Sequence, residues 1–165
     1  MTVSHVVFII LSAVALIGAL GVVTTRKVFY AALFLILSFI GVAGLYILLE
    51  AELLAIVQIL VYVGAIAILI VFAIMLSQRL MSPDYKARNE QWLIALVAGV
   101  ALFAVLVFIL LQVSWPTVEA SVPEDAIAAL GLALVSPDQF VLVFEVASVL
   151  LLVALVGSVI IARER

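Results

Sequence analysis

The chain contains no cysteine and a single histidine, and this excludes several kinds of functional site. Without cysteine there can be no disulfide, thiolate metal site, iron–sulfur cluster or thiol nucleophile. The one histidine, His5, lies close to the N-terminus. No histidine cluster can therefore bind zinc or copper, and no pair of imidazoles can hold a haem.

Charged residues are also scarce. They make up 10% of the 165 residues, whereas 70% are hydrophobic, and the mean hydropathy is +1.56. A soluble domain has roughly 45–50% apolar and about 25% charged residues. Apolar runs long enough to cross the ~30 Å hydrocarbon core of a bilayer recur along the chain, and they lack the strict alternation of a β-barrel. The composition therefore predicts an all-α, polytopic membrane protein.

Hydropathy predicts five transmembrane helices in a single domain, residues 1–165. The predicted spans cover about residues 3–23, 28–49, 53–77, 92–113 and 140–162. The loop 114–139 separates the last two spans. Its apolar stretch 126–135 is too short to cross a bilayer, so we expect a short helix that lies on the outer surface or is tucked against the bundle.

The basic residues predict the orientation of these spans. With five spans, all seven lie on one side of the membrane: Arg26, Lys27, Arg79, Lys86, Arg88, Arg163 and Arg165. Six acidic residues lie on the other side: Glu50, Glu52, Glu119, Glu124, Asp125 and Asp138. The positive-inside rule then places the N-terminus outside and the C-terminus in the cytoplasm.

The third span is otherwise apolar, but it contains polar side chains that would lie at the level of the hydrocarbon core. Gln58 and Tyr62 are four residues apart and share one face of a helix. Gly64 follows, where a helix can bend or be approached closely. An amide and a phenol facing lipid would lack partners, so this face should meet protein or water. Two interpretations stay open: polar contacts that hold helices together, and a point on a proton path.

The fifth span contains one carboxylate, Glu145, with Ser148 one turn further along the same face. The membrane interior disfavours the charged form of an acid, so Glu145 is a candidate proton carrier. Equally, its side chain could bond to a neighbouring helix and hold the two helices together. Small residues in the spans predict close helix packing, among them Gly41, Gly44, Ser148 and Gly157. One embedded glutamate is not a proton relay, and there is no phosphate-binding loop or catalytic triad. The sequence thus indicates a small subunit of a larger assembly.

Residues 58–76, with the string Val61-Tyr62-Val63-Gly64-Ala65-Ile66, resemble the third transmembrane helix of subunit J of proton-pumping NADH-quinone oxidoreductase, respiratory complex I. Residues 129–131 and 144–157 resemble the C-terminal part of that family. The five-span topology also matches. The resemblance implies a subunit without a redox centre, between the quinone-site module and the antiporter-like subunits.

The resemblance further implies a π-bulge in the third helix near Tyr62-Val63-Gly64, whose loss rotates the helix and opens or breaks a water wire. It assigns gating to Tyr62, Val63 and Gly64, while Gln58 and, in the fifth span, Glu145 are candidates for gating or the proton path from their positions inside the spans. Many bacterial members have glutamate at this position. This chain has Gln58 instead, as chloroplast and cyanobacterial members tend to. Since an amide does not titrate, a proton path here would depend on water, Tyr62 and neighbouring carboxylates.

The resemblance also implies the surroundings of the chain. The partners would be the H subunit, which holds the quinone site, the A and K subunits, and the antiporter-like N, M and L subunits. They would share a bacterial plasma membrane or a thylakoid-type membrane with this chain, and no nucleic acid is expected. NAD or ferredoxin, FMN, iron–sulfur clusters and quinone would bind those partners, and no cofactor is expected in this chain. Two alternatives stay open: a purely structural scaffold subunit, and a subunit of a multisubunit cation/proton antiporter.

Overall fold

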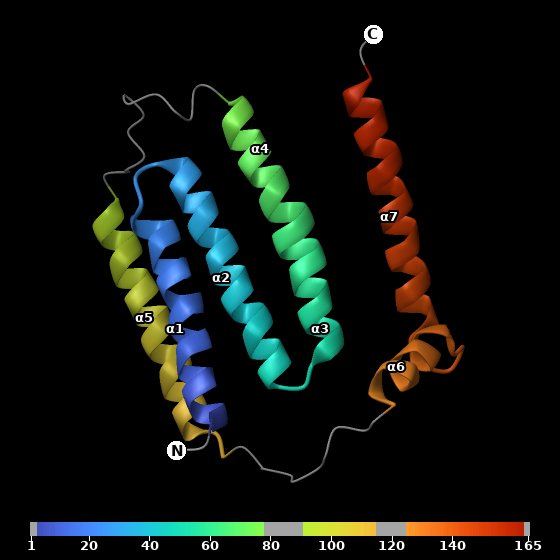
Figure 1. Ribbon diagram of the computed structural model, residues 1–165, viewed down its shortest axis with the longest axis horizontal. Coiled ribbons are helices and arrows are strands. Elements are labelled where there is room, and N and C mark those ends of the chain that lie inside the picture. The colour runs from blue at the N-terminus through green and yellow to red at the C-terminus, as the bar shows by residue number, and fades with distance from the viewer. Residues whose placement is uncertain (1–2, 78–90, 115–124, 164–165) are drawn as a thin grey trace. The chain divides into compact units, whose positions relative to one another are not determined.

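The computed structural model describes residues 3–77, 91–114 and 125–163, and all regular structure within them is helical (Figure 1). Five helices are long and apolar enough to cross a membrane, which confirms the predicted all-α, five-span class. The chain divides into two compact units, Met1–Val118 and Glu119–Arg165.

The helices, in chain order, are α1 (Val3–Thr24), α2 (Val28–Leu48), α3 (Glu52–Val57), η1 (Gln58–Ala67), α4 (Ile68–Leu76), α5 (Trp92–Gln112), α6 (Ala126–Val135) and α7 (Val141–Ala162). Helices α3, η1 and α4 form one continuous third span. All five predicted spans agree with the observed ones to within one residue at each end. The loops that carry Arg79, Lys86, Arg88, Glu119 and Glu124, and the terminal Arg165, lie outside the described residues, so the assignment of sides stays a prediction.

Helices α1 and α2 pack against each other at the level of their backbones. A Cβ added to Gly18 would lie 2.6 Å from the amide nitrogen of Ser38, and one added to Gly41 would lie 2.6 Å from the amide nitrogen of Ala15. Both distances are far below van der Waals contact, so only glycine allows the two helices to approach this closely.

Side chains complete the contact between α1 and α2. Gly21 faces the ring of Phe34, and Gly44 faces the side chain of Leu11. The hydroxyl of Ser38 donates a hydrogen bond to the carbonyl oxygen of Ala15, at 3.0 Å. This bond also depends on the close approach, because a serine side chain reaches a neighbouring backbone only when the two helices nearly touch.

A tight turn at Glu50 connects α2 to the third span. Glu50 has φ = 56°, in the left-handed region, and is the sole non-glycine residue there in the described part of the chain. The amide of Glu50 donates to the carbonyl of Ile47, and the amide of Ala51 donates to that of Tyr46. This is the hydrogen-bond pattern of a Schellman motif, in which glycine usually occupies the left-handed position.

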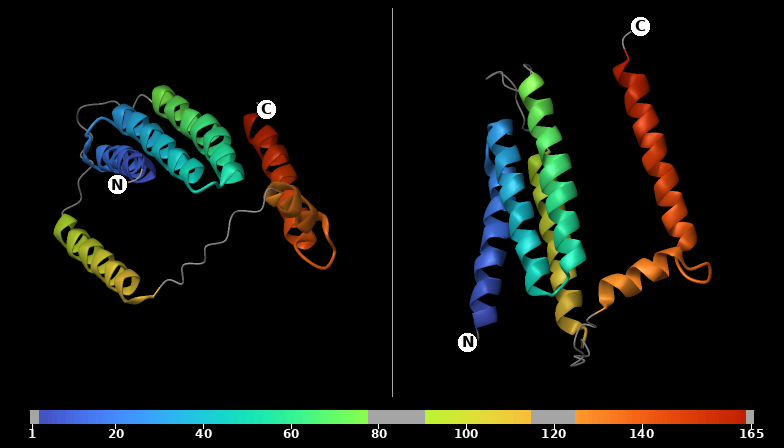
Figure 2. Two further views of the ribbon diagram at one scale, coloured as in Figure 1. Left: turned by 60° about the horizontal axis from the view of Figure 1, so that its bottom comes forward. Right: turned by 45° about the vertical axis from the view of Figure 1, so that its right-hand side comes forward.

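The third span lies beside α2, so α1, α2 and the third span form three adjacent rods (Figures 1 and 2). Helix α5 buries none of its own residues.

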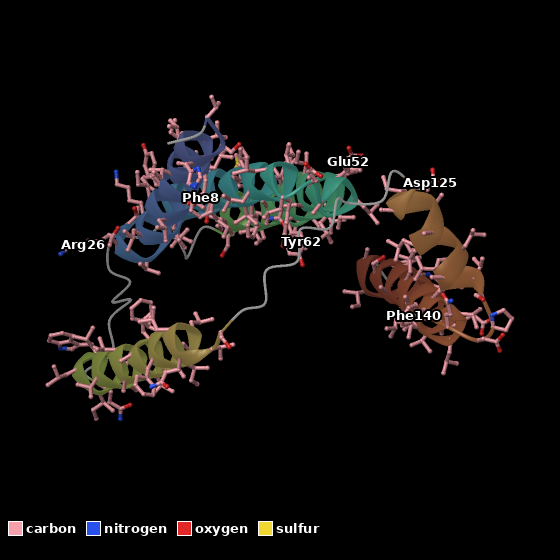
Figure 3. All side chains as sticks on the ribbon, turned by 90° about the horizontal axis from the view of Figure 1, so that it is seen from below. Phe8, Arg26, Glu52, Tyr62, Asp125 and Phe140 are labelled. Carbon is pink, nitrogen blue, oxygen red and sulfur yellow. The ribbon has the colours of Figure 1, made fainter. Side chains whose placement is uncertain are left out.

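In the second unit, α6 packs against the start of α7, and the amide of Phe140 donates a hydrogen bond to the carbonyl of Ala133. Asp125 precedes α6 and Phe140 precedes α7 (Figure 3). The predicted short helix 126–135 is confirmed as α6.

A π-helical segment in the third membrane span

Ten residues in the middle of the third span, Gln58–Ala67, form a π-helix. The flanking residues Val57 and Ile68 have ordinary right-handed helical dihedrals, so the span stays one rod of 25 residues, Glu52–Leu76. In a π-helix each amide bonds the carbonyl five residues earlier, which is rare beyond a single turn and frequent at functional sites. The segment contains Tyr62, Val63 and Gly64. The question of α or π conformation at this motif, which sequence could not decide, is answered by the structure.

The buried residues of the third span show what the π segment does geometrically. They are Ala55, Gln58, Ala67 and Ile74. At 100° per residue, Gln58 and Ala67 would lie on opposite sides of an α-helix. With i→i−5 bonding, at about 4.4 residues per turn, nine residues make about two full turns. The π segment therefore brings all four buried residues onto one face, which packs on α2.

Gln58 is the one polar residue on this face, and only 7% of its surface is exposed. Its side chain thus lies at the contact with α2 and away from lipid. Among the described residues, no side-chain nitrogen or oxygen is both fully enclosed and without a hydrogen-bond partner. The sequence interpretation that this position meets protein or water therefore agrees with its burial.

Tyr62, labelled in Figure 3, is the fifth residue of the π segment and is exposed, with 42% of its surface accessible. Its ring meets the ring of Phe39 from α2 edge to face, with centroids 5.5 Å apart. Within the first unit, the remaining surface of Tyr62 is not covered. The sequence gives no sign of Phe39 as a site residue, because no local pattern pairs two residues 23 positions apart.

Gly64 lies two residues beyond Tyr62, and its neighbourhood reflects the π conformation. Beyond the adjoining residues of its own helix, a Cβ added there would meet one atom within 4 Å, the carbonyl oxygen of Ile59, at 3.3 Å. In i→i−5 bonding this carbonyl is the acceptor for the amide of Gly64. Glycine therefore leaves room for the π hydrogen bond, and a side chain at this position would press on it.

The other predicted site residues lie in the second unit, on α7. Glu145 is exposed there, and the hydroxyl of Ser148 donates to the carbonyl oxygen of Phe144 at 2.9 Å. A Cβ added to Gly157 meets nothing within 4 Å. The structure thus brings Gln58, Tyr62, Val63 and Gly64 together in η1. Glu145, Ser148 and Gly157 lie on α7 in the second unit, and within that unit none of the residues of α7 is buried.

The π segment can act by a change of conformation, and its polar side chains are the phenol of Tyr62 and the buried amide of Gln58. The described residues contain no cluster of three or more histidine, aspartate or glutamate side chains that could hold a metal ion. The arrangement is a helical membrane protein whose third span has a long π-helical segment beside a close-packed helix pair.

Comparison with known proteins identifies the family. Residues 18–161 match the family described as NADH-ubiquinone/plastoquinone oxidoreductase chain 6, and the chain belongs to it. NAD(P)H-quinone oxidoreductase chain 6 of Leptolyngbya boryana is 41% identical over 159 residues, covering 95% of this chain and 78% of the relative. The chloroplastic subunit 6 of Zygnema circumcarinatum is 39% identical, with coverages of 95% and 91%. Chain 6 of Synechocystis is also 39% identical, with coverages of 98% and 82%. The predicted resemblance is confirmed.

Proposed function

We propose that this chain is a cofactor-free membrane subunit of a proton-pumping quinone oxidoreductase, in which η1 couples quinone reduction to proton translocation. Family membership supports the assembly, since the relatives are named as subunits of NAD(P)H-quinone oxidoreductase. One observation carries the coupling role: the π-helix Gln58–Ala67, which is long, of a rare kind and contains the polar residues Gln58 and Tyr62. The electron donor, NAD(P)H or ferredoxin, and the quinone would bind partner subunits.

An α state of the same segment explains how it could act. Conversion of nine residue steps from π to α geometry would turn α4 by about half a turn relative to α3. Ala67 and Ile74 would leave α2, and the exposed Leu69, Phe72 and Leu76 would approach it. Packing on α2 therefore favours the π state. A neighbouring subunit that stabilises the rotated face would favour the α state, which makes η1 a two-state element.

This rotation would also move the polar groups of the span. Gln58 cannot carry a proton through titration, so Tyr62 and water would supply the hydrogen bonds of a path that opens or closes with the rotation. The carboxylates of such a path would come from neighbouring subunits. The partners we propose are the quinone-site H subunit, the A and K subunits, and the antiporter-like N, M and L subunits. Glu145 as a proton carrier stays a prediction.

The proposal includes a location and an orientation. The five spans form one transmembrane domain in a bacterial plasma membrane or a thylakoid-type membrane, with the N-terminus outside. Support comes from the cyanobacterial and chloroplast relatives and from the distribution of basic residues.

Deletion of one residue from η1 tests the coupling role. Removing Leu60, whose side chain is 66% exposed, takes away the extra residue that a π segment accommodates. The span can then be α-helical throughout, with Ala67 within about a quarter turn of Gln58. We expect the complex to assemble and reduce quinone but to lose proton pumping, because the two-state element is gone. Leu60→Ala, which keeps the chain length, is the control.

Other outcomes would support different functions. Wild-type pumping by the deletion variant would contradict the gating role, and the chain would then be a scaffold. If the deletion variant failed to assemble while Leu60→Ala assembled, the chain would likewise be a scaffold. Purification of the chain with antiporter subunits and without electron-transfer subunits would indicate a cation/proton antiporter.

A further inference from the structure

Helix α2 contacts its two neighbours in the first unit through different sides. Ser38 and Gly41 face α1, because Ser38 bonds to Ala15 and a Cβ added to Gly41 would touch Ala15. At 100° per residue, Ser38 and Gly41 lie about 100° and about 160° from Phe39 around the helix. The ring of Phe39 meets the ring of Tyr62. This second side of α2 therefore faces the third span.

The side toward α1 holds α2 in place. The hydroxyl of Ser38 donates to the carbonyl oxygen of Ala15 at 3.0 Å, and at Gly18 and Gly41 the facing helix lies too close for even one methyl group. A turn of α2 about its own axis would break this hydrogen bond and separate these backbones. Phe39 therefore has a fixed position on α2, and its ring is partly buried.

The side toward the third span includes side chains that are too small to interlock. Buried Ala43 lies within about 40° of Phe39 around α2. The third span turns its buried Ala55 and Ala67 toward α2. An alanine side chain is a single methyl group, so these contacts do not fix the direction of any longer side chain. In the described residues, the aromatic contact between α2 and η1 is that of Phe39 with Tyr62, whose ring centroids are 5.5 Å apart.

The orientation of the Tyr62 side chain depends on this ring contact. With 42% of its surface accessible, packing within the first unit leaves the side chain room to turn. Edge-to-face pairing restricts the ring, and the energy of such a pair corresponds to about a two- to tenfold preference for the paired orientation. Because the hydroxyl is bonded to the ring, the contact also sets the direction in which the phenol points.

We propose that Phe39 is a positioning residue for proton translocation: its ring, held on α2, orients the phenol of Tyr62. Phe39 itself has no group that carries a proton, so it acts through Tyr62. The proposal rests on the proposed function, because it requires the phenol of Tyr62 to take part in the proton path.

Substitutions of Phe39 in the assembled complex test this role. Phe39→Leu removes the ring, and we expect the proton-to-electron ratio to fall about two- to tenfold while quinone reduction continues. Phe39→Tyr keeps the ring and should restore the ratio. The ratio is measured for each quinone reduced, so a smaller amount of assembled complex does not change it. If Phe39→Leu fails to assemble, Phe39→Met, which also lacks the ring, is measured in its place.

Phe29→Leu is the matched control. Phe29 lies in the same helix and also meets a tyrosine ring edge to face, that of Tyr30, with centroids 6.0 Å apart and 79° between the planes. Its loss removes the same kind of contact away from η1. We expect Phe29→Leu to keep the wild-type proton-to-electron ratio.

A double substitution shows whether Phe39 acts through the phenol. Tyr62→Phe removes the hydroxyl, and in that background Phe39→Leu should lower the ratio no further. Residues that act through one contact give non-additive effects, whereas independent residues give effects that multiply. Multiplied losses in the double variant would therefore overturn the proposal.

Two other results would also overturn it: a wild-type ratio for Phe39→Leu, and an equal loss for Phe29→Leu. The deletion of Leu60 separates this failure from that of the proposed function. If the deletion variant loses pumping while Phe39→Leu pumps normally, the positioning role alone is wrong. If both variants pump normally, the proposed function is wrong as well.

Discussion

The ring of Phe39 in α2 lies edge to face against the ring of Tyr62 in η1, with an angle of 71° between their planes. This contact joins the rigid pair of α1 and α2 to the middle of the π segment. Any rotation of the third span must break it or carry it along. Phe39 therefore belongs to the site as a positioning residue for Tyr62.

Two substitutions separate the ring of Tyr62 from its hydroxyl. Tyr62→Phe keeps the ring contact, so we expect stability to change by less than about 0.5 kcal/mol, the range of changes that break no named feature. Proton pumping should fall severalfold while quinone reduction continues. Phe39→Leu removes the ring contact and should cost about 0.5–1.5 kcal/mol. Proton-to-electron ratios and SDS titration of the chain in micelles measure the two effects; identical behaviour of both variants would contradict a role for the phenol.

Gly64→Val tests the room that the π hydrogen bond requires. The new Cβ would lie 3.3 Å from the carbonyl oxygen of Ile59, and its methyl groups would crowd the same acceptor. We expect pumping to fall severalfold in the assembled complex. Ile66→Val, in the same segment, adds no atom near Ile59 and should pump normally. Equal pumping by both variants would show that the crowding at Gly64 is harmless.

The glycines of the first helix pair should be intolerant of even one methyl group. Gly18→Ala and Gly41→Ala each place a carbon 2.6 Å from a backbone nitrogen of the facing helix. Overpacking of this kind costs about 1–3 kcal/mol. Gly99→Ala is the control, because nothing lies within 4 Å of that position. The free energy of unfolding in SDS titrations should fall for the first two variants and stay constant for the third.

Ser38→Ala should destabilise the chain through the loss of a hydrogen bond between helices. Interhelical hydrogen bonds in membrane proteins contribute about 0.6 kcal/mol on average, with a maximum near 1.7. The hydroxyl of Ser158 donates within its own helix, to Leu155, so Ser158→Ala serves as the comparison. Unfolding free energies of the two variants measure the difference, and a larger loss for Ser158→Ala would contradict the structural assignment.

Glu50→Gly should stabilise the chain by about 0.5–1 kcal/mol, because a left-handed position strains every residue with a Cβ. The gain is below the full strain, since glycine also increases the entropy of the unfolded chain. Glu52→Gly, in the first turn of α3, should destabilise it instead. A stabilising effect of both changes would mean that the acidic charge at this turn, and not its backbone strain, governs stability.

The amino-acid sequence by itself determined the class of the protein and the ends of its five spans. Hydropathy is a sum over neighbouring residues, and a bilayer allows a spanning backbone only as a helix or in a closed barrel, so long apolar runs without alternation decide both. The motif at Tyr62-Val63-Gly64 also identified the family, which the comparisons confirmed.

Only the tertiary structure decided which faces meet and which conformation the third span adopts. The pairing of Gly18 with Ser38, the contact of Phe39 with Tyr62 and the burial of Gln58 join residues far apart in the chain. The conformation of the π segment also depends on a contact between helices. The π form is stabilised because it turns Ala55, Gln58, Ala67 and Ile74 together onto α2. Such a gain comes from packing between helices, which no local pattern of residues encodes.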